Sequence, residues 1–126
     1  MRITHLGHSC LLVELADRRI LIDPGSFSSG FEDLTDLDAI LVTHQHGDHL
    51  DLKRLPALVR ANPGTALHAD PMSAALLAEA GLSVRALEQG SDCSVGEVQI
   101  RPVGAVHAFN HAWVPTVANV GVHLVA

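Results

Sequence analysis

Short runs of apolar residues, separated by polar turns, divide the chain into predicted strands. The first third contains three such runs, at residues 2–6, 9–15 and 20–23, and a Pro-Gly pair ends the third. Because short strands joined by brief polar turns are typical of hairpins, we expect this part to open an antiparallel sheet. The next run, Ala39–Val42, is apolar at every position, as in a strand that is buried on both faces.

The spacing of apolar residues becomes helical after this strand. Residues 50–61 place Leu50, Leu55 and Leu58 on one side of an amphipathic helix, which an Asn-Pro-Gly sequence ends. Pro56 either belongs to the first turn of this helix or kinks the part before it, because proline cannot donate a backbone hydrogen bond.

Strands and helices then alternate, which is typical of an α/β layer. Asp70 and Pro71 suit the N-cap and the first residue of a helix, which we expect to continue through residues 72–80. Further strands are predicted at residues 65–69, 82–87, 92–95, 98–103 and 120–125. We therefore expect one α/β (α+β layered) domain over residues 1–126, with a mixed sheet and helices on one face. The other face would remain a large apolar patch.

The polar sequence after the strand at 39–42 concentrates side chains that bind metals. Three imidazoles, of His44, His46 and His49, and the carboxylate of Asp48 fall within six positions. These ligand types suit Zn²⁺ and its first-row neighbours. In extended backbone the first two imidazoles point to the same side, whereas the last two side chains can face a second point. The spacing predicts two adjacent metal positions; the alternative is a His-rich surface loop.

The pattern H-x-H-x-D-H at the end of a buried strand resembles the signature of the metallo-β-lactamase fold superfamily of metal-dependent hydrolases. The Gly-His-Ser sequence at 7–9 and the Ile-Leu-Ile-Asp-Pro sequence at 20–24 resemble the opening of its ascorbate-6-phosphate lactonase-like branch. The resemblance covers essentially the whole chain but only the first half of the family's usual length. It implies the N-terminal half of an αββα sandwich.

The resemblance also implies further site residues. His107, which follows the strand at 98–103, matches a third metal histidine that joins His44 and His46 and leaves one coordination position open for water. Asp23 matches a carboxylate that orients a ligand imidazole; the alternative is an Asp that caps the following turn. His8 would lie near the site and contact substrate, or serve only its own turn.

On this basis we expect hydrolysis of an ester, lactone or phosphodiester bond by metal-activated water. Asp48 would bind the second metal or orient the nucleophile and accept its proton. One or two Zn²⁺ ions are expected, with Mn²⁺ or Fe²⁺ as alternatives. The Gly-Asp-Thr sequence that often carries a bridging Asp in the family's second half does not occur. The competing hypothesis is a non-catalytic, metal-binding half-domain that needs a homodimer partner or a longer chain.

Net charge and composition limit the classes of partner that we expect for this protein. A formal net charge of −6 offers no basic surface for nucleic acid or anionic membranes, so a nuclease is disfavoured and a small-molecule substrate is expected. No apolar run approaches the roughly 18 residues of a membrane span, and the start lacks the apolar core of a signal peptide; a cytoplasmic protein is expected. Cys10 and Cys93 are expected to be buried thiols rather than a disulfide.

Overall fold

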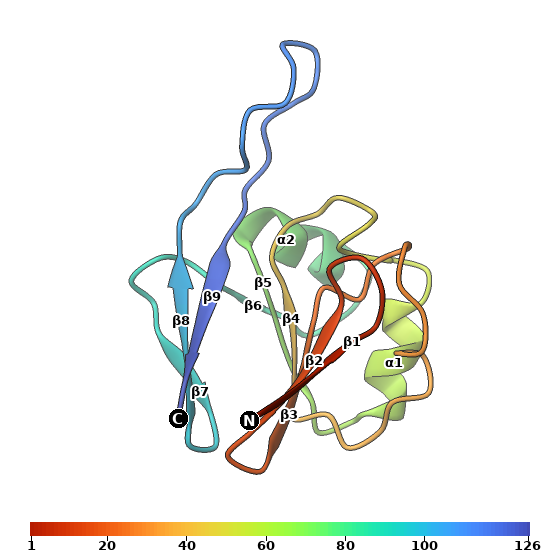
Figure 1. Ribbon diagram of the computed structural model, residues 1–126. Helices are drawn as coiled ribbons and strands as arrows, with labels where there is room; N and C mark the ends of the chain where they lie inside the picture. Colours follow the sequence, from red (N-terminus) through yellow and green to blue (C-terminus); the bar gives the residue numbers. More distant parts are fainter.

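The computed structural model describes residues 1–126 and contains two β-sheets and two helices (Figure 1). The larger sheet has the strand order β1-β2-β3-β4-β5-β6, and the smaller has the order β7-β8-β9. The strands are β1 (Arg2–His5), β2 (Leu11–Leu15), β3 (Arg18–Ile22), β4 (Ala39–Val42), β5 (Ala66–Ala69), β6 (Arg85–Ala86), β7 (Cys93–Val95), β8 (Val98–Val103) and β9 (Gly121–Val125). The helices are α1 (Leu55–Ala61) and α2 (Pro71–Glu79).

The larger sheet is mixed, as the sequence predicts. Strands β1, β2 and β3 are antiparallel neighbours, and β3 to β6 run parallel. Parallel pairing places the carboxyl ends of β3, β4 and β5 at one edge of the sheet, where loops that bind ligands commonly gather. The loop that carries three of the nine histidines leaves β4 at this edge.

Both helices cover one face of the larger sheet, as expected. Leu55 and Leu58 of α1 and Leu77 of α2 pack in one cluster with Ile40 and Val42 of β4. Helix α1 begins at Leu55, five residues later than the sequence predicts, and its proline occupies the first turn. Proline accounts for this start, because a helix that ran through it would lose a backbone hydrogen bond and clash with the preceding turn. With seven and nine residues, neither helix has the length and apolar character to cross a membrane.

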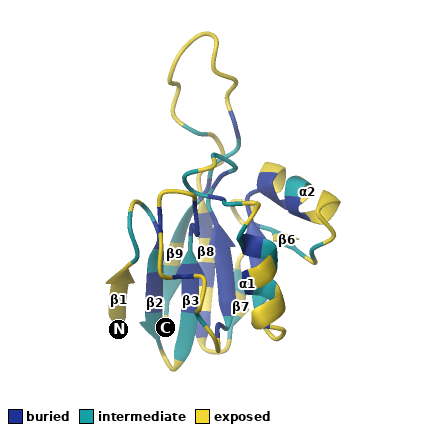
Figure 2. Ribbon diagram, turned by 90° about the vertical axis from the view of Figure 1, so that its right-hand side faces the viewer, coloured by how far each residue is buried: buried dark blue, intermediate teal, exposed yellow.

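The smaller sheet covers the opposite face of the larger one, and here the prediction of an uncovered apolar patch is wrong. Ala39 and Leu41 of β4 point to this side, where they form a second core cluster with Val98 and Ile100 of β8. Strand β8 alternates between buried and exposed residues, so one of its faces lies inward (Figure 2). The core therefore has two layers, one on each face of β4.

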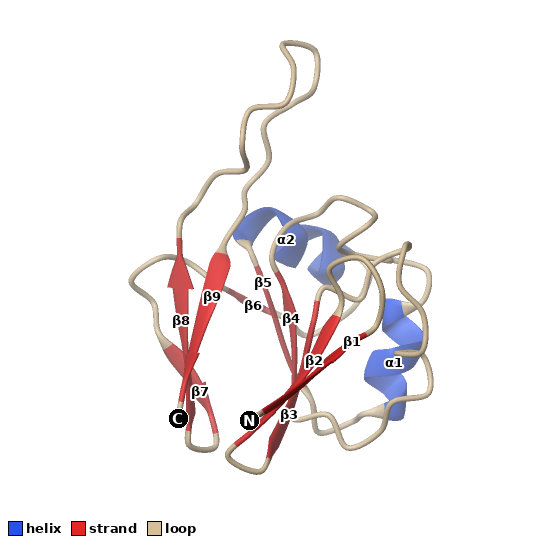
Figure 3. Cartoon of the chain, viewed as in Figure 1, coloured by secondary structure: helices blue, strands red, loops and turns tan.

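A long excursion between β8 and β9 projects beyond both sheets (Figure 3). We call residues 104–120 the projecting hairpin, because Val106 and Ala118 pair across it in antiparallel fashion. Phe109 and Trp113 are exposed on it. Its base is fixed to the larger sheet, since the backbone amide of Val120 donates to the carbonyl oxygen of Thr43 at 3.0 Å. This contact brings the base of the hairpin to the carboxyl end of β4.

Candidate metal centre

The histidine loop, residues 43–50, rests directly on the turn that follows β3. The amide of Ser26 donates to the carbonyl oxygen of Gly47 at 2.8 Å, and the amide of Asp51 donates to that of Pro24 at 3.0 Å. Gly25 permits this approach, because a Cβ atom there would lie 1.8 Å from the carbonyl oxygen of Asp48. The two loops are therefore held together mainly by backbone contacts that only a glycine allows.

A single guanidinium joins the surrounding loops. Arg54 donates to the carbonyl oxygens of Gly25 at 2.7 Å and Ser28 at 2.9 Å. It also donates to the carboxylate of Asp51 at 2.7 Å and lies 4.4 Å from the ring centroid of Phe31. Several bonds from one planar group fix the turn after β3 beneath the histidine loop.

The imidazoles of His44, His46 and His107 meet in one cluster. Each pair of ring centroids is 4.8 Å apart, and one nitrogen from each ring lies within 4.8 Å of the other two. The first two rings come from the end of β4 and the third from the start of the projecting hairpin, so the two sheets contribute to one cluster. The structure brings these three side chains together, and their role as metal ligands stays a prediction.

Hydrogen bonds set the tautomers of two of these imidazoles. The hydroxyl of Thr43 donates to Asp23 at 2.7 Å, so its oxygen accepts from Nδ1 of His44, which is 3.0 Å away. Nδ1 of His107 donates to the carbonyl oxygen of Ala108 at 2.8 Å. Because Nδ1 carries the proton in both rings, Nε2 keeps its lone pair for a ligand.

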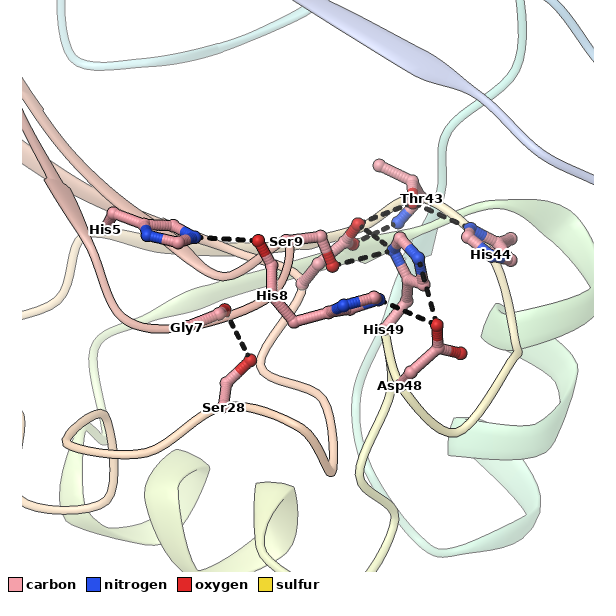
Figure 4. A network of polar contacts seen from close by, with 10 residues as sticks. His5, Gly7, His8, Ser9, Ser28, Thr43, His44, Asp48 and His49 are labelled. Atoms are coloured by element: carbon pink, nitrogen blue, oxygen red, sulfur yellow. Dashed lines mark hydrogen bonds and ion pairs between the residues drawn. The ribbon is translucent and has the colours of Figure 1, made fainter.

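A second cluster lies beside the first and contains His8, Asp48 and His49 (Figure 4). Nε2 of His8 is 2.8 Å from Oδ2 of Asp48, and Nε2 of His49 is 3.6 Å from the same oxygen. Nδ1 of His49 donates to Oδ2 of Asp23 at 2.7 Å, and the hydroxyl oxygen of Ser9 lies 3.1 Å from the same Nδ1 atom. The buried carboxylate thus orients the imidazole of His49 toward Asp48, which is the function that the resemblance implied for it.

Burial and neighbouring charges tune these groups for ligand binding. Burial, with the adjacent imidazoles of His49, His46 and His107, lowers the pKa of His44 to about 4, so its ring is neutral at pH 7. Burial raises the pKa of Asp23, against the hydrogen bonds from His49 and Thr43. Partial burial acts to raise the pKa of Asp48, but the hydrogen bond from His8, a backbone hydrogen bond and the nearby imidazoles together outweigh it, so the pKa lies below its usual range.

The donor set suits a first-row divalent cation. Neutral imidazoles with preset tautomers, an ionised carboxylate and an outer carboxylate behind a ligand histidine are the groups that bind and orient such ions. All the residues singled out in the sequence take part in one of the two clusters or support it: His8, Asp23, His44, His46, Asp48, His49 and His107. The sequence does not identify Ser9 and Thr43, whose hydroxyls complete the network.

Comparison with known proteins agrees with this geometry. The sequence model of the beta-lactamase superfamily domain matches residues 2–122. Protein Rv0786c of Mycobacterium tuberculosis is 48% identical over 120 residues, which are 95% of this chain and 55% of that protein. The UPF0173 protein PF0020 of Pyrococcus furiosus is 30% identical over 108 residues, 85% of this chain and 50% of that protein. The chain thus spans about half the length of the relatives it matches.

Solved structures show the same fold. The crystal structure of a proposed metal-dependent hydrolase from Parabacteroides distasonis superimposes with a TM-score of 0.78 at 27% identity, covering 98% of this chain and 55% of that one. An isothiocyanate hydrolase from Delia radicum gut bacteria superimposes with a TM-score of 0.72 at 19% identity, covering 99% and 58%, and shows the fold alone. Since the family match spans almost the whole sequence, the chain belongs to the beta-lactamase superfamily domain family.

Proposed function

We propose that this chain carries the first metal position of a hydrolase that cleaves an ester, lactone or phosphodiester bond of a small molecule. The observation that supports this most strongly is the convergence of His107 with His44 and His46 from a different sheet. A His-rich surface loop gives no reason for an imidazole that is 61 residues beyond His46 in sequence to complete a triangle of rings. Relatives of the chain, such as the UPF0173 protein of Methanopyrus kandleri, are named metal-dependent hydrolases.

In this proposal three Nε2 atoms, those of His44, His46 and His107, hold a Zn²⁺ ion. When bound, such an ion acts as a Lewis acid and lowers the pKa of a coordinated water from 15.7 to about 7. Three protein ligands leave one position of a tetrahedral ion for water or substrate. The preset tautomers of His44 and His107 mean that neither ring must reorient to bind.

Asp48 supplies the acid–base chemistry in this proposal. Its carboxylate is ionised, because the hydrogen bond from His8 helps to keep its pKa low, and it is partly exposed beside the histidine cluster. A carboxylate in this place orients an attacking water and accepts its proton. The net charge of −6 agrees with a small-molecule substrate rather than a polyanion.

The substitution His46→Ala tests the proposal, with His123→Ala as a matched control because His123 is exposed on β9. Loss of a ligand should weaken Zn²⁺ binding by more than about 100-fold, since even groups behind the ligands contribute 10–100-fold. Binding is measured by isothermal titration calorimetry, and hydrolysis with a nitrophenyl ester, a lactone and a nitrophenyl phosphodiester. Both should be lost in His46→Ala and kept in His123→Ala. Equal Zn²⁺ affinity in the two variants would contradict the proposed ligand set.

A further inference from the structure

The projecting hairpin carries no formal charge. None of residues 104–120 is Asp, Glu, Lys or Arg, although these four types make up 17% of the chain. Its aromatic side chains are open to solvent, since Phe109 is 76% exposed and Trp113 is 89% exposed. Single exposed apolar side chains are ordinary, but several that gather in one place mark a contact surface.

Other exposed apolar side chains lie at the same end of the molecule. The hairpin leaves the sheets beside α2, where the sulfur of Met72 accepts from the amide of Ala118 at 3.1 Å (Figure 1). The ring of Phe27, on the turn after β3, packs on the imidazole of His8 at 5.5 Å between centroids. Six of the ten exposed large apolar side chains belong to this group, which we call the apolar rim: Phe27, Met72, Val106, Phe109, Trp113 and Val114.

Basic side chains, in contrast, are absent from the loops that build the metal centre. The turn before β2 at residues 7–9, the turn after β3 at residues 23–30, the histidine loop and the projecting hairpin contain no Lys or Arg. The guanidinium of Arg54 is occupied by the carbonyl and carboxylate oxygens that it holds together. Proteins commonly bind phosphate groups through Arg and Lys. These loops offer a phosphate group no such partner.

We propose that the substrate is a neutral ester or lactone with an apolar acyl group, and that Phe109 and the apolar rim contact this group. The inference rests on the proposed function and narrows its substrate class, because it sets the phosphodiester aside. Phe109 follows His107 by two residues, so their Cα atoms are at most about 7 Å apart. An acyl chain of several carbons, with its carbonyl at the histidine cluster, therefore reaches the start of the hairpin.

The test compares hydroxamic acids that differ only in the acyl chain, namely acetyl, hexanoyl and octanoyl, with adipic monohydroxamic acid. The last has the length of the hexanoyl compound but ends in a carboxylate. Hydroxamic acids bind Zn²⁺ through their oxygens and leave the chain free to contact the protein. Calorimetry on the Zn²⁺-loaded chain measures affinity. The emission of Trp113, the single tryptophan, reports contact at the hairpin.

Two variants show which surface the acyl chain contacts. Phe109→Ala removes an exposed ring from the apolar rim, so the fold should not change. Ile3→Ala is the matched control, because Ile3 is also an exposed apolar side chain but lies on β1, outside the apolar rim. Circular dichroism monitors folding, and Zn²⁺ titration confirms that each variant still binds the ion.

We expect the octanoyl compound to bind at least about 10-fold more tightly than the acetyl compound, because one fully buried CH₂ group is worth about fourfold in affinity. The emission of Trp113 should shift to shorter wavelength. The adipic compound should bind at least about fivefold more weakly than the hexanoyl compound, since its carboxylate loses water without gaining a basic partner. Phe109→Ala should weaken octanoyl binding at least about threefold and leave acetyl binding unchanged, whereas Ile3→Ala should change neither.

Three results would overturn this inference alone while Zn²⁺ binding persists. They are equal affinity for the acetyl and octanoyl compounds, an octanoyl affinity that Phe109→Ala leaves unchanged, and adipic binding as tight as hexanoyl binding. A dimer in sedimentation that Phe109→Ala dissociates, without any gain from acyl length, would assign the apolar rim to a second copy instead. A chain that binds no Zn²⁺ would overturn the proposed function as well.

Discussion

Asp23 links the fold to the site more directly than any of the proposed ligands. Its carboxylate accepts three hydrogen bonds, from the backbone amide and hydroxyl of Thr43 and from Nδ1 of His49. It is almost fully buried, with 3% of its surface exposed. The residue that follows β3 therefore orients both the start and the end of the histidine loop through one side chain.

The substitution Asp23→Asn should weaken both the fold and the metal site. An amide has only one acceptor oxygen, so at least one of the three donors loses its partner, which costs about 1–3 kcal/mol of unfolding free energy. Zn²⁺ affinity should fall roughly 10–100-fold, as when other groups behind ligand histidines are removed. Urea unfolding and calorimetry measure the two effects. Asp36→Asn is the control, because Asp36 is exposed and has a similar positive φ angle; equal behaviour of the two variants would contradict this role.

Among individual residues, the sequence predicts the imidazoles and carboxylates of the site but not its hydroxyls. The spacing of His44, His46 and Asp48 is unusual enough to indicate metal ligands. Thr43 and Ser9 carry no such signal, because hydroxyl residues are common in turns and caps and only the fold brings these two to His49 and Asp23.

Strand β4 shows what patterns can and cannot predict about whole elements. Its uniformly apolar sequence predicts burial on both faces, and both faces are buried. The alternation in β8 predicts a half-buried strand, but not which surface it covers. The error over an uncovered face arises because the pairing of β8 with β7 and β9 separates it from the larger sheet, and local patterns contain no information on how two sheets stack.

Paired substitutions in β8 test this packing. Ile100 is fully buried against β4, whereas the neighbouring Gln99 is exposed. Ile100→Ala should lower the unfolding free energy by about 2–5 kcal/mol through lost contacts and a cavity. Gln99→Ala should change it by no more than about 0.5 kcal/mol, as at most surface positions. Similar urea midpoints for the two variants would show that the smaller sheet does not cover the larger one.

Across the whole molecule, the site forms where the two sheets meet. The larger sheet contributes the histidine loop, and the smaller contributes His107 through the hairpin base that the Val120–Thr43 hydrogen bond fixes. The predicted homodimer was inferred from an apolar sheet face that is in fact covered by the second sheet, so dimerisation stays a prediction without that support. The relatives are about twice as long as this chain. The hydrolase activity of a complete protein is therefore proposed here and not shown by the fold.

The measurement that tests the account most directly is anomalous X-ray diffraction at the zinc edge from crystals of the Zn²⁺-loaded chain. We predict an anomalous peak about 2.0–2.1 Å from Nε2 of each of His44, His46 and His107. An ion bound only to residues of the histidine loop, with His107 turned away, would contradict the claim that both sheets build one metal site.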